Sequence, residues 1–395
     1  MDLRFGSASL FVVEPPYKFT SEKFEQVYTA PAGSQRPALS TIYPQMDVPD
    51  LAMEDSSTHL TWTILHNYPT DVWVDTRWRE FLSRAEYAAH YVSPEYFREP
   101  FFRDKRPFVV LVWKGERVVA VVSGIHEEHR LVCGLMSRPQ MCFDPTVDLA
   151  TLSEALADGL SNEAGADKLV TLYSWVPLYT LSKRGYQCKN EEGVVMLDLT
   201  KGAHELFKEF APTRRTNVRN AIKRGVDVFT ATTHEEFRVY YEIYSDWCRR
   251  KNIPRCPFEV MEEALNLPNR QLLLARYEGK IIATEITRLY PGGMIEAASN
   301  SSLVEYLKLK PNDLLLWRVI EWACAKGFKR YSLGGAHLFL RLTGGSIVPV
   351  YGYTLDRTWL HRYEIKEALE KSGRNAFNAL PGGLRTRVRR VLRHH

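Results

Sequence analysis

The stretches VVLVWKGERVVA (residues 109–120) and LLARYEGKIIA (residues 273–283) repeat one pattern within a single chain. In each, an apolar run and an aromatic residue lead into a tight turn at Gly115 or Gly279. Basic residues and a β-branched pair that ends in Ala follow, so each stretch predicts a β-hairpin. The same signals then recur in order: a second hairpin, a helical stretch that ends at Gly, and a short strand. A repeat of this length predicts two similar domains in tandem rather than a solenoid of small units.

The repeat divides the 395 residues into four parts, in keeping with the two domains that this length favours. Residues 1–60, rich in Pro, Ser and Thr without sustained periodicity, are expected to be an N-terminal extension. The first domain is predicted over 61–198 and the second over 199–360, and 361–395 reads as a basic helical tail. The predicted fold class is α/β (α+β), with each domain a mixed, mostly antiparallel sheet flanked by helices.

Capping signals predict where the main helices begin and end. Asp148 precedes a helical pattern that stops at Gly165, and Thr233 with Glu236 forms a capping box. Asn312 is the expected N-cap of a strongly apolar helix. The predicted helices are 73–90, 149–163, a basic helix after Thr213, 235–251 and 313–326.

Composition excludes several classes of protein. The net charge of +5 is mild, and the six cysteines contain no C-x-x-C pair, which favours reduced thiols in a cytoplasmic protein. No closely spaced Cys and His pairs predict a metal site. The N-terminus lacks a signal-peptide pattern, and no apolar run approaches the roughly 20 residues of a membrane-spanning helix. Nothing in the sequence indicates a tightly bound cofactor or a DNA partner.

Two segments resemble a known family. RRTNVRNA at residues 214–221 is similar to the basic helix that opens the second half of Fem-type aminoacyltransferases and their GNAT-related relatives. ASNSS at 298–302, followed by LKPNDLL at 309–315, resembles the most recognisable block of the same group. The resemblance implies two GNAT-like domains and transfer of an acyl group to an amine. Some members take an amino acid from aminoacyl-tRNA, whereas others use acetyl-CoA.

The chain also departs from that family pattern. Gly334-Gly335-Ala336 stands where relatives often carry Gly-Arg-Ser, and Ile347-Val348 stands where they often carry Phe-Lys. These departures leave a non-catalytic binding protein on the same fold as an alternative. The loops 137–148 and 300–312 contain no glycine, unlike the phosphate loop of simple CoA-binding relatives. This favours aminoacyl-tRNA slightly over acetyl- or acyl-CoA as the donor.

Alignment of the two copies gives the second copy two carboxylates, Glu285 and Glu296, inside otherwise apolar strands. With a two-residue hairpin loop at 291–292, both would lie diagonally on one face of the sheet. Neighbouring, partly buried carboxylates suit a general base for an attacking ammonium group, so both are catalytic candidates. A loop one residue longer would place them on opposite faces. The other interpretation is that one or both pair with Arg288 or another basic residue, or face water.

A second set of residues predicts substrate binding. Lys308 and Lys310 precede the abrupt helix start at Asn312, and cations beside free helix N–H groups bind anions. A well-capped helix with solvated lysines is the simpler alternative. Asn300 and Ser301 belong to the block that carries the resemblance and are expected to contact substrate. Tyr351 could line a pocket or belong to the alternating core of its strand.

Basic segments suggest contacts with anionic partners. Arg214, Arg215 and Arg219 lie on one short helix, and arginine forks suit the phosphates of a diphosphate-bearing acceptor or of a tRNA acceptor stem. A solvated face over the domain boundary is the alternative. The stretch 384–393 is basic and amphipathic and could contact RNA or an anionic membrane surface, or remain solvated.

Together these features predict an N-acyltransferase that works by direct attack of an amine, without a covalent enzyme intermediate. The expected acceptor is the amine of a small molecule or peptide, of a sugar, or of a cell-wall-type precursor.

Overall fold

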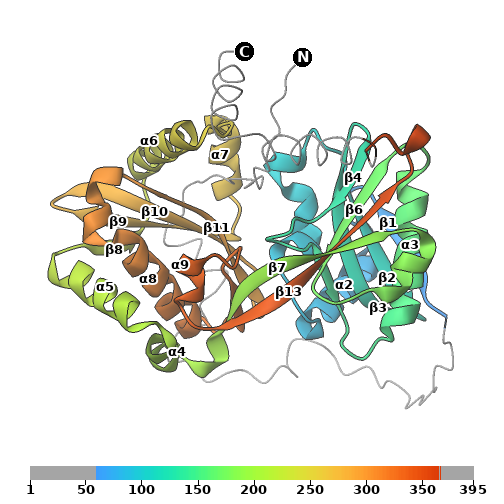
Figure 1. The fold of residues 1–395 in the computed structure, drawn as a ribbon, viewed down its shortest axis with the longest axis horizontal. Helices are drawn as coiled ribbons and strands as arrows, with labels where there is room; N and C mark the ends of the chain where they lie inside the picture. Colours follow the sequence, from blue (N-terminus) through green and yellow to red (C-terminus); the bar gives the residue numbers. More distant parts are fainter. Residues whose placement is uncertain (1–58, 364, 366–395) are drawn as a thin grey trace, which may run out of the picture.

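The computed structural model describes residues 59–363 and residue 365. The predicted N-terminal extension up to residue 58 and the basic stretch 384–393 lie outside the described residues. Within the described chain, the strands join in one 13-stranded sheet in the order β1-β2-β3-β4-β6-β13-β7-β12-β11-β10-β9-β8, with β5 paired to β3. Two halves lie side by side along this sheet (Figure 1).

The first half is built from the N-terminal repeat. Its strands are β1 (Thr61–Leu65), β2 (Pro107–Lys114), β3 (Arg117–Glu127), β4 (Arg130–Cys133), β5 (Met141–Phe143), β6 (Leu169–Ser174) and β7 (Gln187–Asp198). Its helices are α2 (Val72–Arg84) and α3 (Leu149–Ala164), and its 3₁₀ turns are η2 (His90–Val92), η3 (Pro94–Arg98), η4 (Pro100–Phe102) and η5 (Tyr179–Arg184).

The second half repeats the arrangement with additional helices. Its strands are β8 (Asp227–Thr230), β9 (Arg270–Tyr277), β10 (Lys280–Leu289), β11 (Met294–Ser302), β12 (Arg330–Ser332) and β13 (Ser346–Asp356). Its helices are α4 (Ala203–Glu209), α5 (Pro212–Lys223), α6 (His234–Lys251), α7 (Phe258–Leu265), α8 (Pro311–Ala325) and α9 (Leu338–Arg341). The 3₁₀ turns η6 (Leu199–Lys201), η7 (Val304–Leu309) and η8 (Trp359–His361) complete it.

The two halves share one topology, as the sequence repeat predicts. In the first, β3 pairs antiparallel with β4, and β4 pairs in parallel with β6 after the crossover helix α3. In the second, β10 pairs antiparallel with β11, and β11 pairs in parallel with β12 after α8. The predicted fold class, tandem mixed sheets flanked by helices, is therefore confirmed.

The two halves exchange their last strands. β7 follows β6 in the chain but pairs with β12, whereas β13 follows β12 but pairs with β6. The two exchanged strands also pair with each other and run between the halves (Figure 1). A boundary at residue 198 falls at the end of β7, yet each half of the sheet holds one strand from the other side of that boundary. The exchange joins both sheets into a single unit.

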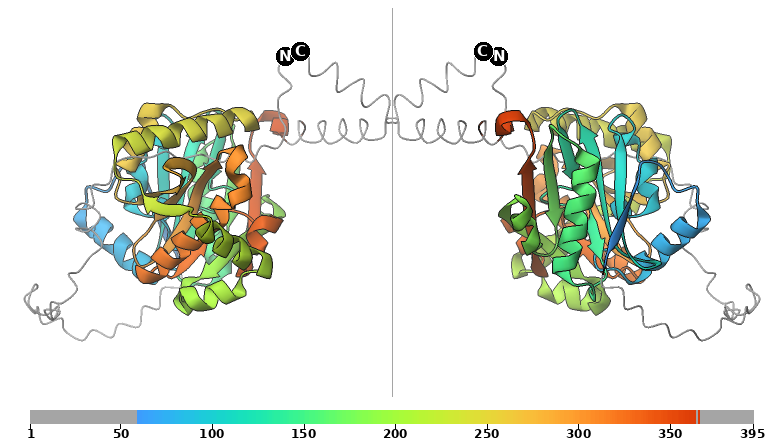
Figure 2. Two further views of the ribbon diagram at one scale, coloured as in Figure 1. Left: turned by 90° about the vertical axis from the view of Figure 1, so that its left-hand side faces the viewer. Right: turned by 90° about the vertical axis from the view of Figure 1, so that its right-hand side faces the viewer.

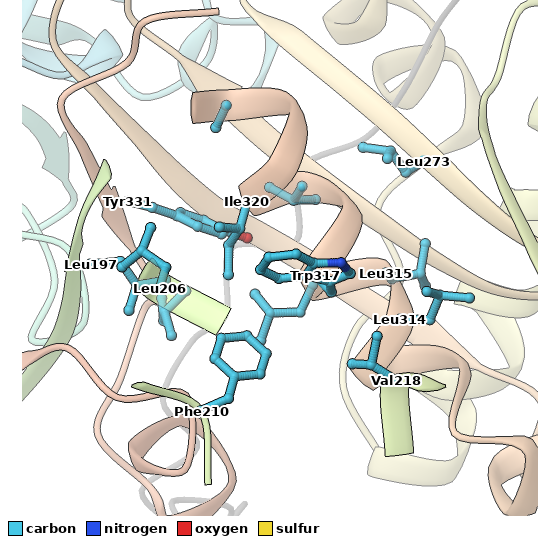
Figure 3. Close-up of a cluster of buried hydrophobic side chains, with 14 of the residues drawn as sticks. Leu197, Leu206, Phe210, Val218, Leu273, Leu314, Leu315, Trp317, Ile320 and Tyr331 are labelled. Carbon is cyan, nitrogen blue, oxygen red and sulfur yellow. The ribbon is translucent and has the colours of Figure 1, made fainter. Parts of the chain in front are cut away.

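Each sheet is covered on both faces, because its strands are apolar on both. In the second half, one apolar cluster joins the sheet to α5 and α8, and another joins the opposite face to α6 and α7. Figure 2 shows these helices from the side of the second half. The ring centroid of Trp317 on α8 lies 4.5 Å from that of Phe207. It lies 5.8 Å from that of Phe210 (Figure 3). α8 is apolar almost all round because it is buried on most sides.

Several local predictions hold in the structure. Asp148 caps α3, which ends at Gly165, and Thr233 with Glu236 forms a complete capping box at α6. The N-cap of α8, however, is Lys310 in a left-handed conformation, with Pro311 as the first helical residue. The predicted Asn312 cap is therefore wrong: proline at the first position fixes the start two residues earlier.

Two other sequence expectations also fail. The basic helix α5 starts at Pro212 after Ala211, so Thr213 is not its cap, again because proline occupies the first position. α2 ends at Arg84 rather than at residue 90, since the chain turns extended at Ala85.

Candidate active site

A cavity of about 340 Å³ opens where β11 and β12 separate. The two strands pair only from Met294 to Glu296 and from Arg330 to Ser332, and β11 then continues alone on that side. The cavity is lined by Arg138, Trp247, Glu285, Ala297, Ala298, Ser299, Asn300, Asn312, Leu316, Tyr331, Leu333, Gly334, His337, Phe339 and Leu340. A wedge between diverging strands leaves backbone groups of β11 available to a ligand.

Glu285 is a buried carboxylate in the wall of this cavity. It lies on β10, is 5% exposed, and accepts hydrogen bonds of 2.9 Å from Asn300 Nδ2 and from the Tyr331 hydroxyl. Burial raises its pKa from the ordinary value of 4.5 to about 7, and both hydrogen bonds and the nearby Arg214 limit the rise. A carboxylate with a pKa near 7 can take and release a proton at neutral pH.

Arg214 lies behind Glu285 rather than in the cavity wall. Its Nη1 is 3.0 Å from Asp313 Oδ1, and its guanidinium stacks 3.8 Å from the ring centroid of Phe339. Burial raises the pKa of Asp313, and Arg214 offsets that rise in part. The predicted role of Arg214 as a direct phosphate ligand therefore does not fit, because this arginine is buried within the fold. It forms an ion pair with Asp313, and its positive charge favours the ionised form of Glu285.

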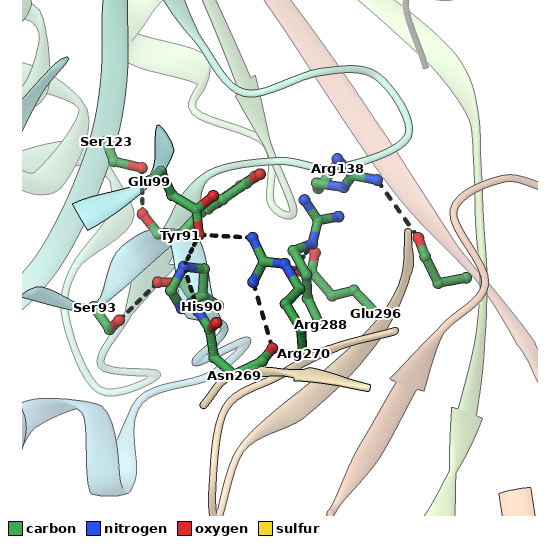
Figure 4. A network of polar contacts seen from close by, with 11 residues as sticks. His90, Tyr91, Ser93, Glu99, Ser123, Arg138, Asn269, Arg270, Arg288 and Glu296 are labelled. Carbon is green, nitrogen blue, oxygen red and sulfur yellow. Dashed lines mark hydrogen bonds and ion pairs between the residues drawn. The ribbon is translucent and has the colours of Figure 1, made fainter. Parts of the chain in front are cut away.

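Glu296 lies on the opposite face of the sheet from Glu285. The hairpin loop contains three residues, since Tyr290 N donates to Met294 O at 3.1 Å, and a bulge in β11 shifts the register further. Glu296 therefore stands opposite Arg288, 3.6 Å from its Nε, and both are buried (Figure 4). The predicted common face of the two glutamates is wrong, and the alternative, in which Glu296 pairs with Arg288, is confirmed.

Of the other predicted substrate residues, Asn300 and Asn312 line the cavity with Glu285. The structure does not bring the rest to that cavity. On α5, Arg215 donates a hydrogen bond to the Lys208 carbonyl oxygen and Arg219 stacks on Phe207. The side chains of Lys308 and Lys310 are exposed to solvent. Ser301 is buried in β11, and Tyr351 packs against the core of the first half. Their substrate roles remain predictions.

Two contributors to the site were missed by sequence reasoning. No sequence pattern distinguishes Tyr331 from an ordinary core residue, because the hydrogen bond of its hydroxyl to Glu285 exists only in the folded chain. Arg138 precedes β5 in the first half, and only the packing of the two halves brings it to a cavity of the second. His337 also lines the cavity, and burial and the charge of Arg214 lower its pKa, so its ring is neutral at pH 7.

Among residues 59–363 and 365, no group of three or more His, Cys, Asp and Glu side chains is placed to hold a metal ion. None of the helices in the same part of the chain has the length and apolar character of a segment that crosses a bilayer.

Comparison with known proteins shows what the second half of the chain is similar to. Residues 212–339, which include most of the cavity wall, match the family model "Acetyltransferase (GNAT) domain". A comparison with curated protein sequences gave no significant match.

Among solved structures, FemX superposes with a TM-score of 0.57 at 13% identity, covering 75% of this chain and 98% of its own. The C-terminal domain of a putative lysylphosphatidylglycerol synthetase from Agrobacterium fabrum gives 0.51 at 12% identity, with 71% and 91% covered. A tandem GNAT protein from the clavulanic acid pathway gives 0.49 at 13%, with 76% and 99% covered. The match shows that residues 212–339 resemble a GNAT acetyltransferase domain, and the superposition shows that the chain shares its fold with FemX, as the resemblance implied.

Proposed function

We propose that this protein transfers an acyl or aminoacyl group from a carrier to an amine, with Glu285 as the general base. The observation that carries the proposal is a buried carboxylate with a pKa of about 7 in the wall of a cavity between diverging strands. A structural carboxylate in such a place would be expected to form an ion pair, as Glu296 does with Arg288.

The chemistry needs a small number of steps. The acceptor enters as an ammonium ion and gives one proton to Glu285, which frees the nitrogen lone pair to attack the acyl carbonyl carbon. The C–N bond forms as the ester or thioester bond to the carrier breaks. The second proton on nitrogen leaves with the carrier hydroxyl or thiol. Asn300 and Tyr331 hold Glu285 in place, since each donates to one of its carboxylate oxygens.

For the donor, acyl-CoA is the first choice, supported by the match to an acetyltransferase domain. Aminoacyl-tRNA, which the sequence favoured slightly, is the second candidate. Two of the arginines proposed for tRNA, Arg214 and Arg215, make contacts within the chain. Three other basic residues are exposed and could contact the phosphates of a tRNA: Arg219, Lys308 and Lys310. Aminoacyl-tRNA is therefore included in the test.

The test is single-turnover acyl transfer with acetyl-CoA and with aminoacyl-tRNA, each against a panel of amines. Glu285→Gln should lower the transfer rate about 10²–10⁴-fold, as expected for loss of a general base. Glu305→Gln, at an exposed glutamate of η7, is the matched control and should keep the wild-type rate. Full activity of Glu285→Gln would refute the proposal. Absence of turnover with every pair, alongside ligand binding, would favour the non-catalytic alternative.

A further inference from the structure

The cavity receives one side chain from the first half of the chain. Among the described residues that line it, Arg138 is the one that precedes residue 199, and the others lie between Trp247 and Leu340. Arg138 is 4% exposed, and its Nη2 lies 3.5 Å from the Ala297 carbonyl oxygen of β11 (Figure 4). Its guanidinium therefore sits against the strand that forms one wall of the cavity.

The loop that carries Arg138 is held in a fixed shape. Leu135 and Arg138 exchange two backbone hydrogen bonds of 2.9 and 2.8 Å, which close the loop after β4. Gly134 has a φ of 81°, and a Cβ atom there would approach Gln140 N to 2.6 Å. Because glycine is needed for both the turn and the close approach, the position of Arg138 is set before any ligand binds.

The charges in the cavity wall are one guanidinium and one carboxylate. Arg138 is always ionised, and Glu285 is its counterpart of opposite sign on β10. The remaining wall is apolar, or neutral and polar, with His337 uncharged at pH 7. Buried charges in such a wall interact more strongly with ligand groups of opposite sign than exposed charges do. A guanidinium fork fits a carboxylate with two parallel hydrogen bonds.

We propose that the acceptor is a zwitterion, an amino acid whose carboxylate binds Arg138 while its ammonium group faces Glu285. This inference rests on the proposed function and adds the substrate class to it. A volume of about 340 Å³ is at the lower end of the range for small-molecule sites, ~300–1,000 Å³, and suits an amino acid rather than a polymer. Arg138 is then the residue that selects the acceptor, and the first half of the chain supplies specificity to the second.

The experiment compares acceptors in pairs, each L-amino acid with its own α-carboxamide, for wild type and Arg138→Met. In wild type, kcat/KM should be at least about tenfold higher for the amino acid than for its carboxamide, because the carboxylate forms a charge-assisted hydrogen bond that the carboxamide cannot form. Arg138→Met should remove that preference by slowing the amino acid alone, and Arg138→Lys should restore part of it. The carboxamide also changes the basicity of the amine, but equally for every variant, so the comparison between variants isolates Arg138.

Arg84→Met is the matched control. Arg84 lines a different cavity, together with Ala85 and Glu86, and its Nε lies 3.4 Å from Asp144 Oδ2. Its substitution should therefore leave the preference for the amino acid over the carboxamide unchanged. Thermal denaturation checks that each variant is folded. Two results for Arg138→Met would overturn the inference. If kcat/KM falls equally for the amino acid and its carboxamide, Arg138 has a structural role. If only the KM of the donor rises, Arg138 binds the donor.

Failure of the proposed function is a separate outcome. If wild type acylates simple amines without preferring carboxylates, the inference fails and the proposed function stands. If Glu285→Gln is as active as wild type, the proposed function fails. Binding can then be measured without turnover: thermal stabilisation by amino acids but not by their carboxamides, lost in Arg138→Met, would still support the assignment of Arg138.

Discussion

The Tyr331 hydroxyl donates a 2.9 Å hydrogen bond to Glu285, although the two residues lie on β12 and β10 with β11 between them. Both side chains are buried, so this hydrogen bond passes over β11 within the protein interior and is shielded from solvent. It favours the ionised form of Glu285 and opposes the effect of burial. Tyr331 therefore helps to set the pH at which Glu285 can act as a base.

Removal of that hydroxyl should move the pH dependence of catalysis. Tyr331→Phe takes away a donor to the carboxylate, so the pKa of Glu285 should rise above its value of about 7. The rising limb of a pH–rate profile should shift to higher pH by up to about one unit, with much of the maximal rate recovered there. A profile that keeps its midpoint while the maximal rate falls would contradict this role.

Glu285 should make the protein less stable as the pH rises. Its folded pKa of about 7 exceeds the ordinary 4.5, so the folded state binds the proton more tightly than the unfolded state between these values. The free energy of unfolding of wild type, relative to Glu285→Gln, should fall by up to about 3 kcal/mol across that window. Urea denaturation of both proteins at a series of pH values measures it. A constant difference would show that Glu285 does not titrate in this range.

Glu296→Gln should act on stability and not on the chemical step. The substitution leaves Arg288, which is fully buried and stacks 4.4 Å from the ring centroid of Tyr91, without its carboxylate. The loss of one partner of a buried ion pair costs ~3–5 kcal/mol. Chemical denaturation gives this value, with the exposed Glu305→Gln expected to change stability by less than about 0.5 kcal/mol. A large fall in kcat for properly folded Glu296→Gln would instead restore the catalytic role that the sequence suggested.

The strand exchange should depend on Gly193. This residue of β7 has a φ of 88°, and a Cβ atom would collide with the carbonyl oxygen of Val348 on β13. Gly225 also has a positive φ, 84°, but no atom within 4 Å of such a Cβ. Gly225→Ala should cost about 1–2 kcal/mol from backbone strain alone. Gly193→Ala should cost at least about 1 kcal/mol more, because the collision adds to the strain. Equal losses in the two unfolding curves would mean that the crossing of β7 and β13 is not tightly packed.

Sequence reasoning was reliable where the decisive contacts are local. The hairpins, the capping box at Thr233 and Glu236, and the end of α3 at Gly165 follow from residues a few positions apart. The duplicated topology was also accessible, because the same signals occur in the same order twice. The fold class and the resemblance to GNAT-related acyltransferases follow from these patterns.

The candidate site was only partly accessible from sequence. Glu285 could be singled out because a carboxylate inside an apolar strand is unusual. Its equivalence with Glu296 failed, since one additional loop residue and a bulge decide which face a side chain takes. Arg214 resembled a surface phosphate ligand until its contact with Asp313, 99 positions away, was known.

By itself, the sequence determined that this is a duplicated α/β chain with a polar second half, since hydrophobic period, turns and caps are short-range properties. Only the tertiary structure decided that β7 and β13 change places, that burial raises the pKa of Glu285 to about 7, and that Arg138 enters the cavity of the other half. These features depend on register, burial and packing between segments that are far apart in the chain, by 46 positions for Tyr331 and Glu285 and by 159 for Arg138 and Ala297. No local pattern encodes such contacts, because the desolvation that sets the pKa of Glu285 exists only once the strands have come together.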